Sequence, residues 1–293
     1  MIVSCWLSFA ACGGEGAERE GAETPAASAS PVEDAAPVKA PSPTDGDAFL
    51  RALAPLPPPA GESKEAGLRL RYRVRGPAGS SGELIVELAA GGLRREAWTL
   101  KLPAMGGAPE RELRSLRVQT RSQVWNAVGD GAGEVYDNPL AEIAEAYEAR
   151  DEAKREVLIR TLRDWQAALV NARREQPGER EEIEGTSCLR MTMAGQALCI
   201  WEETGLPLRH QGDAFELEVE SIESIGSMPA DIFELPGRAA KAKKVDPPQA
   251  WSTTGEAWLE ALERGEPTAL AAVLTPGLRM PVAAELGQAD SAG

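Results

Sequence analysis

The chain has 293 residues, in which 46 acidic side chains outnumber 31 basic ones and leave a formal net charge of −15. A charge of this sign provides no basic footprint for the phosphates of a nucleic acid, so we exclude nucleic-acid binding. It is the ordinary charge of a soluble, self-repelling surface.

The first eleven residues, MIVSCWLSFAA, are almost all apolar or small, and the chain turns polar after Cys12. Spanning a bilayer takes about twenty apolar residues, so we interpret residues 1–11 as a secretory signal peptide. The residues Phe9-Ala10-Ala11-Cys12 resemble a bacterial lipobox, although Phe9 stands where Leu is preferred and no Lys or Arg precedes the run. We therefore expect lipid attachment at Cys12; an N-terminal strand is the alternative.

The segment that follows, residues 12–63, is rich in Ala, Pro, Glu, Ser and Gly and holds few large apolar side chains. Such a segment buries too little surface to offset the entropy lost on ordering. We predict that it is a disordered tether between the lipid anchor and a β-rich folded domain over residues 64–237.

The predicted domain opens with LRLRYRVR (68–75), in which apolar residues alternate with arginines. This period of two is typical of a half-buried strand. A glycine- and serine-rich turn and the segment GELIVELA follow, which indicates a hairpin that pairs Arg75 with Glu83 and Arg71 with Glu87. Because the arginines would then face glutamates, we interpret them as a solvated ion-pair face. An anion site is the alternative.

Further strands are predicted over residues 93–102 and 116–128, with Trp125 in the second segment, and a helical insertion over residues 138–176. Asn138-Pro139 is a typical helix start, and the insertion is either one long helix or two with a break near Asp151. Its Leu and Trp side chains recur at helical spacing, so we expect them to pack on the apolar face of the sheet.

Cys188 and Cys199 flank a predicted turn near Ala194-Gly195, and a simple hairpin would place them roughly opposite each other. We predict a disulfide between them, which is typical of an oxidising compartment. A reduced, buried pair is one alternative. A zinc site is another, although two thiols without further nearby ligands make an incomplete site.

These elements are sequential and antiparallel in character, which predicts an α+β fold. We expect a curved, mostly antiparallel sheet that forms an unclosed half-barrel, with the helical insertion packed on one face. A basic linker is predicted over residues 238–250 and a helical tail over residues 251–293, where Thr253-Thr254-Gly255-Glu256 fits a capping box.

Residue types that carry chemistry are scarce in this sequence. The only histidine, His210, lies in a predicted turn, and Ser80-Ser81 has no base nearby in sequence. No nucleophile elbow, phosphate-binding glycine loop or metal-ligand spacing is present. We therefore predict that the protein is not an enzyme and uses no cofactor or metal.

The segment CIWEETGLPLRHQGDAFELEVESIESIGSMPADIFELP (199–236) resembles the closing strands of the LolA/LolB-like superfamily of outer-membrane lipoprotein carriers. The resemblance is carried by these residues: Trp201, Thr204, Gly205, Leu206, Pro207, Leu208, Phe233, Leu235 and Pro236. It implies an unclosed barrel whose concave face is capped by helices and encloses an apolar cavity for acyl chains. No motif identifies the lining, for which Tyr72, Val86 and Trp125 are candidates.

Two functions follow from this interpretation. The first is a membrane-anchored envelope lipoprotein that binds a hydrophobic ligand, a lipid or a lipidated protein, in the half-barrel cavity. The second is a structural or interaction lipoprotein that presents a sheet surface to an envelope partner without ligand or catalysis. Gly13, rather than Asp, follows the predicted lipidated cysteine, which favours the outer membrane.

Overall fold

The computed structural model describes residues 45–54, 56, 66–104, 109–193, 196–212, 215–247 and 254–264. The predicted signal peptide, the lipid attachment at Cys12 and residues 12–44 of the tether lie outside the described residues. So do residues 265–293 of the predicted tail. Those predictions therefore stay predictions.

One sheet of 12 strands forms the centre of the fold, in the order β12-β6-β5-β4-β3-β2-β1-β11-β10-β9-β8-β7. Neighbouring strands are antiparallel except for β12 and β6, which are parallel. The strands are β1 (Gly67–Arg75), β2 (Ser81–Ala89), β3 (Leu93–Leu102), β4 (Arg111–Gln119), β5 (Gln123–Val128), β6 (Glu134–Asp137), β7 (Arg180–Ile183), β8 (Thr186–Met193), β9 (Gln196–Trp201), β10 (Pro207–Gln211), β11 (Glu216–Ile225) and β12 (Lys243–Lys244).

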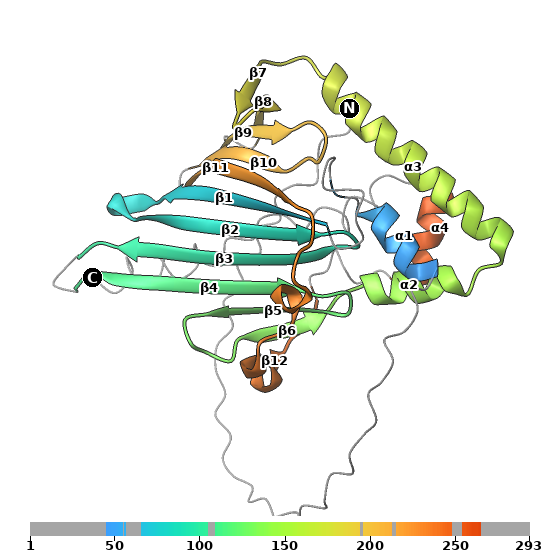
Figure 1. Cartoon of the computed structure of the whole chain (residues 1–293), viewed down its shortest axis with the longest axis horizontal. Coiled ribbons are helices and arrows are strands. Elements are labelled where there is room, and N and C mark those ends of the chain that lie inside the picture. Colours follow the sequence, from blue (N-terminus) through green and yellow to red (C-terminus); the bar gives the residue numbers. More distant parts are fainter. Residues whose placement is uncertain are drawn as a thin grey trace, which may run out of the picture. The chain divides into compact units, whose positions relative to one another are not determined.

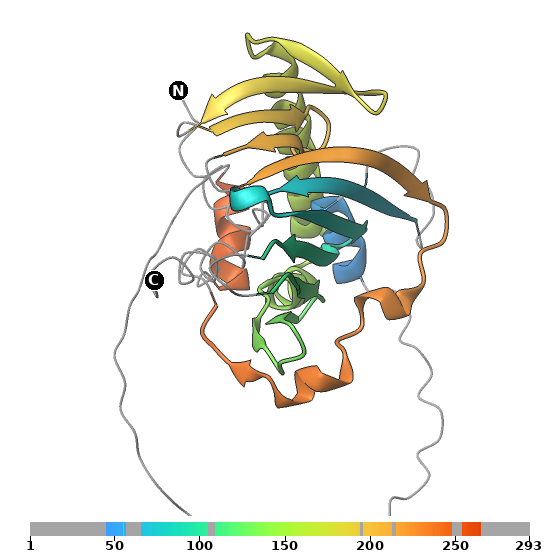
Figure 2. The same ribbon diagram turned by 90° about the vertical axis from the view of Figure 1, so that its left-hand side faces the viewer.

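The sheet is curved and does not close, since β12 and β7 stand at opposite ends of the strand order (Figures 1 and 2). The predicted α+β fold with an unclosed, mostly antiparallel sheet is confirmed.

Strand β1 has two distinct faces, because successive side chains of a strand point to opposite sides. We call the side that carries Leu68, Leu70, Tyr72 and Val74 the core face, since all four side chains are buried. The opposite side, which carries the four arginines of β1, is called the charged face. On the core face, Leu70 lies opposite Val86 and Tyr72 opposite Leu84 of β2.

The largest apolar cluster begins on the core face and continues onto strands β7 to β10. Its buried members are Leu68, Leu70, Tyr72, Val74, Leu84, Val86, Trp98, Leu100, Ile183, Cys188, Cys199, Trp201, Leu208, Phe215, Leu217 and Val219. Burial of apolar surface on this scale is the main source of stability for the sheet.

The predicted register of the first hairpin is wrong by two residues. Glu83 lies opposite Arg73 rather than Arg75, and Glu87 lies opposite Arg69 rather than Arg71. The cause is the turn: a short 3-10 segment, Pro77–Gly79, lets the Gly76 N–H donate to the Ser80 carbonyl at 2.8 Å, so pairing begins as early as Ser81. A shift of two residues leaves every side chain on its predicted face.

Four helices among the described residues pack against one another: α1 (Asp45–Leu53), α2 (Leu140–Glu148), α3 (Glu152–Glu175) and α4 (Gly255–Glu263). Figure 1 shows α1, α2 and α4 side by side beyond one end of the strands. At their centre the ring of Phe49 stacks on Tyr147 with centroids 4.2 Å apart and meets the edge of Trp258 at 6.4 Å. These helices therefore form a second apolar core.

The helical insertion does not use the surface that we predicted for it. Leu158 and Leu162 of α3 are buried in the cluster formed with α1, α2 and α4, rather than on the apolar face of the sheet. The aromatic and leucine side chains of α1 and α4 supply the apolar surface that the insertion needs. The helices touch the sheet at its turns, where the Gly91 N–H donates to the Ala54 carbonyl at 3.3 Å.

Gly92 shows why a glycine is needed in the turn between β2 and β3. Its φ is +81°, and a Cβ there would lie 2.5 Å from Cδ1 of Leu140 at the start of α2. Only glycine adopts this conformation without strain and admits a side chain so close.

Two segments that we predicted as a tether and a linker contain ordered elements. Helix α1 lies within residues 12–63, because Phe49, Leu50 and Leu53 have the spacing of one helix face although the segment around them is poor in apolar residues. Within residues 238–250, the 3-10 segment η4 (Gly237–Lys241) leads into β12, which pairs with β6. Side chains of this segment pack on Trp125, which a linker would not do.

The helices begin at or next to the residues that we predicted as caps. The insertion is broken at Asp151, whose carboxylate accepts a hydrogen bond from the Lys154 N–H at 2.9 Å and so caps α3. Helix α4 begins after Thr254, whose hydroxyl accepts from the Ala257 N–H at 3.3 Å. The predicted capping box, with Thr253 three residues before Glu256, is therefore wrong by one residue, since Thr254 is the cap.

Replacing Phe49 by Ala tests whether α1 is part of the folded unit. We expect Phe49→Ala to lower the free energy of unfolding by about 3–5 kcal/mol, because it removes the ring between Tyr147 and Trp258. The measurement is urea unfolding followed by tryptophan fluorescence. Val157→Ala, at a side chain that is 42% exposed on α3, is the control and should change the same quantity by less than about 0.5 kcal/mol. Equal shifts for both variants would contradict the packing of α1.

Candidate binding surface

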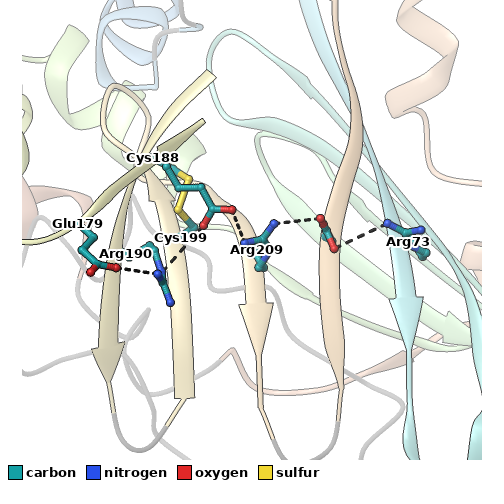
Figure 3. A network of polar contacts seen from close by, with 8 residues as sticks. Arg73, Glu179, Cys188, Arg190, Cys199 and Arg209 are labelled. Atoms are coloured by element: carbon teal, nitrogen blue, oxygen red, sulfur yellow. Dashed lines mark hydrogen bonds and ion pairs between the residues drawn. A yellow bond between two sulfur atoms is a disulfide. The ribbon is translucent and has the colours of Figure 1, made fainter. Parts of the chain in front are cut away.

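A series of ion pairs crosses the charged face from β7 to β1 (Figure 3). Arg190 on β8 binds Glu179 at 2.7 Å, just before β7. Arg209 on β10 binds Glu181 at 2.6 Å and Glu218 at 3.0 Å. The register explains the series, because Glu218 lies opposite Arg209 on one side and opposite Arg73 on the other.

The same face continues through β1 to β3. Arg71 binds Glu83 at 3.2 Å, and Glu87 binds both Arg69 at 2.8 Å and Arg95 at 2.6 Å. Including the pairs of Arg73 with Glu220, Arg75 with Glu216 and Arg69 with Glu223, seven arginines meet eight glutamates on this face. The predicted ion-pair face is confirmed, and its charges nearly balance in a chain whose net charge is −15.

These pairs differ in how firmly they hold their members. The Glu87 side chain is only 4% exposed between its two arginines, whereas the Arg190 and Glu179 side chains are 57% and 78% exposed. Exposed pairs contribute about 0–1 kcal/mol each. Burial works against the charged form of Arg209, but hydrogen bonds to Glu181 and Glu218 outweigh it and raise the pKa of that guanidinium.

The charged face is hollowed near its β7 edge. The hollow has a volume of about 520 Å³ and opens to solvent, and it is lined by Glu179, Arg180, Glu181, Arg190, Arg209 and Gln211. Its lining comes from β7, β8 and β10 and from the residue that precedes β7. Every lining side chain is charged or polar, so the hollow suits a charged or hydrogen-bonding group.

The predicted disulfide forms between Cys188 and Cys199, whose Cα atoms are 5.3 Å apart. The two residues lie diagonally on β8 and β9, because Cys199 lies opposite Arg190 and Cys188 opposite Trp201. Cys199 is also opposite Arg209 of β10, so the disulfide lies between Arg190 and Arg209 (Figure 3). Its buried sulfurs join the strands that carry them.

A second polar cluster lies on the core face and is buried. Glu96 on β3 is 1% exposed, and its Oε1 lies 2.5 Å from Nε of Arg94 and 3.2 Å from Nη1 of Arg117 on β4. Arg117 also donates to Gln119 at 3.5 Å, and the Gln119 amide donates to the Gly92 carbonyl at 2.8 Å. Sequence reasoning missed this cluster, although Arg94 and Glu96 stand at the same alternate positions of β3 as the apolar Trp98 and Leu100, which signals charges on the buried side of the strand.

The three candidate cavity residues do not share one face of the sheet. Tyr72 and Val86 are both 1% exposed in the cluster of the core face. Trp125 lies opposite Val118, which in turn lies opposite Arg95, so the register places it on the charged side. There it packs under Leu235, Ala239 and Ala242, with the Arg238 guanidinium 5.1 Å from its ring.

Within the part of the chain that the structure describes, two hollows on the charged face are lined mostly by charged and polar side chains. An apolar cavity lined by Tyr72, Val86 and Trp125 therefore stays a prediction that no described hollow supports.

The residues singled out for chemistry lie apart from one another. His210 is in β10 rather than in a turn, where its Nε2 lies 2.9 Å from Oε1 of Gln196, and burial lowers its pKa. The Ser80 hydroxyl donates to the Pro77 carbonyl. The described residues contain no cluster of three or more potential metal ligands, and none of their helices is long and apolar enough to cross a membrane.

Comparison with known proteins finds only distant likeness. No protein-family model and no curated protein sequence matches the chain. A crystal structure of MucB aligns at 15% identity, over 66% of this chain and 64% of that one, with a TM-score of 0.29. A complex of Pseudomonas aeruginosa MucA and MucB aligns at 11% identity, over 66% of this chain and 62% of that one, with the same TM-score.

The chain thus spans less than two thirds of the MucB chains that it matches. The LolA/LolB-like resemblance agrees with the observed fold class, an unclosed curved sheet with helices, and membership of that superfamily stays a prediction.

Replacing Glu96 tests the buried cluster. We expect Glu96→Gln to lower the free energy of unfolding by about 3 kcal/mol, because it removes the carboxylate that two buried guanidinium groups share. Glu218→Gln removes a carboxylate from a partly exposed pair and should cost less than about 1 kcal/mol. Urea unfolding measures both, and a smaller loss for Glu96→Gln than for Glu218→Gln would count against the cluster.

Tyr72 makes the free energy of unfolding depend on pH in the alkaline range. Burial raises the pKa of its phenol, Arg94 lowers it and Glu96 raises it, with a net increase above the ordinary value of about 10. Above that pH the unfolded chain loses a proton that the folded chain keeps, so stability falls as pH rises, by up to about 1.4 kcal/mol per pH unit. Between pH 9 and pH 11 the wild type should lose about 1 kcal/mol more than Tyr72→Phe in urea unfolding. Parallel losses in the two proteins would refute this role.

Proposed function

We propose that this chain is an envelope-facing lipoprotein without catalytic activity, which presents the charged face of its sheet to a partner protein. The observation that carries the proposal is the ordered series of ion pairs from β7 to β3. The lipobox-like residues before Cys12 support a lipid anchor and an envelope location. The disulfide between Cys188 and Cys199 supports an oxidising compartment.

The balance of charge on this face favours a protein as the partner. A polyanion needs a surface of one sign, whereas seven arginines alternate here with eight glutamates. Protein surfaces carry both signs, and complementary arrangements of them provide specificity and register. The less exposed members, such as Glu87 and Arg209, are already oriented by two partners each, which reduces the entropy that a partner protein must remove on binding.

A hydrophobic ligand in the half-barrel is supported less well. The apolar side chains of the core face lie against one another, and Leu70, Val74 and Leu84 are fully buried. Acyl chains need an apolar space, and the hollow at β7 to β10 has a polar lining. The interaction function therefore agrees better with the described residues than the ligand-binding function does.

Site-specific photo-crosslinking in the cell envelope tests the proposal. A photoreactive amino acid replaces Lys101, an exposed residue on the charged face of β3, or Val157 on α3 as the control. We expect one protein adduct in stoichiometric amount from position 101 and none from position 157. Adducts of equal yield at both positions, or none at either, would refute the charged face as the binding surface.

A charge change then tests the chemistry of that adduct. Glu218→Lys breaks the bridge between Arg209 and Arg73 and should reduce the adduct at least five-fold. Glu145→Lys makes the same change in net charge at an exposed position on α2 and should leave the adduct unchanged. Native mass spectrometry of the purified protein distinguishes the ligand function, since a co-purifying acyl species without any protein adduct would replace our proposal.

A further inference from the structure

The three arginines of the hollow are not equally available to a partner. Arg180 is held by the Glu202 carboxylate at 3.0 Å and donates to the Arg174 carbonyl. Arg209 is held between two carboxylates, at 2.6 Å and 3.0 Å. An incoming anion would have to replace several contacts of either guanidinium.

Arg190 is held much less firmly. Among the described residues its one close side-chain partner is Glu179, at 2.7 Å, while Glu181 lies at 4.0 Å and accepts its short hydrogen bond from Arg209. The side chains of Arg190 and Glu179 are 57% and 78% exposed, so water screens their attraction. Exposed ion pairs of this kind contribute little to stability, so another carboxylate can replace Glu179 at little cost.

We propose that an acidic side chain of the partner protein enters the hollow and binds Arg190 in place of Glu179. This inference rests on the proposed function, since it names the chemistry by which a partner binds the charged face. The exposed side chain of Gln211 lines the same hollow, and its amide has donors for the second oxygen of the incoming carboxylate.

The lining of the hollow favours an acidic side chain of the partner over a basic one. It contains three arginines and two glutamates, and Glu181 already accepts from Arg209. A lysine of the partner would find only Glu179 available and would lie close to Arg190. The net charge of −15 opposes an acidic partner at long range. At physiological ionic strength the screening length is about 8 Å, so the local arrangement decides.

The test measures binding of a defined acidic probe to the full mature chain. Isothermal titration at about 0.15 M salt uses a blocked hexaglutamate peptide as the probe, and inorganic phosphate as a second probe. We expect Glu179→Gln to bind the peptide about two- to five-fold more tightly, because it removes the internal competitor. Arg190→Gln should weaken binding at least ten-fold, because it removes the cation itself.

Matched controls come from an exposed pair at the opposite end of the sheet. Lys244 and Asp137 are 2.9 Å apart and 69% and 55% exposed. Lys244→Gln and Asp137→Asn change the net charge by the same amounts as Arg190→Gln and Glu179→Gln, and should leave the affinity unchanged. Because all four positions are exposed, circular dichroism should show the wild-type fold in each variant.

Several outcomes would overturn the inference. It fails if the variants in the hollow change the affinity no more than their controls, or if Glu179→Gln weakens binding. It also fails if inorganic phosphate binds as tightly as the peptide with the same dependence on Arg190, since the hollow would then be a site for free anions. Peptide binding that depends on Arg190, without any adduct at position 101, would refute the proposed function and leave the chemistry of the hollow standing.

Discussion

The pairing of β1 with both β2 and β11 is the constraint on which the rest of the structure depends. Strands β2 to β6 precede the helical insertion and strands β7 to β11 follow it, and β1 joins these two halves into one sheet. Its alternating side chains supply the buried centre of the core face and the arginines of the charged face. A shift of one residue in the pairing of β1 would move its apolar side chains to the charged face and its arginines to the core face. The core and the ion pairs therefore depend on the same register.

The packing of the four helices is a second constraint, because it holds together segments that are far apart in sequence. Helix α1 precedes the sheet, α2 and α3 interrupt it, and α4 follows it, yet all contribute to one apolar cluster. Phe49, Tyr147 and Trp258 each come from a different one of these segments and meet as rings. The cluster therefore ties both flanks of the sheet domain to the insertion, and the insertion leaves the face of the sheet to other contacts.

Local patterns in the sequence were enough to predict most strands, the break at Asp151, the disulfide and the fold class. The register of the first hairpin needed the geometry of the turn at Pro77–Gly79, which composition does not specify. Helix α1 was missed because a short apolar stripe, Phe49 to Leu53, lies at the end of a polar segment whose average composition indicates disorder. Its stability comes from partners in α2, α3 and α4, which lie far along the chain.

The hollow was missed for a related reason. The hollow is formed by residues on or next to separate strands, among them Glu179, Arg190 and Arg209, and the order of these strands depends on long-range pairing. The sequence of one strand does not show whether a charged residue on it has an ion-pair partner on another strand. The buried Glu96 had a local signal, a charge at a core-face position of β3. Recognising it required knowing that Arg117 lies directly opposite on β4.

The ion pairs of this sheet range from buried pairs, whose members are held in place, to exposed pairs, in which one member can be replaced by another charged group. Glu96 and Glu87 are almost completely buried between arginines, where removing a partner leaves a buried charge and costs several kcal/mol. The Arg209 side chain is intermediate in exposure, and Arg190 is the most exposed of the three arginines that line the hollow. The disulfide joins β8 and β9 beside this exposed end, so an exchangeable pair stands on a backbone that is held in place. A partner can replace contacts there without disturbing those that stabilise the fold, which is the physical reason why its acidic side chain binds at the β7 end of the charged face.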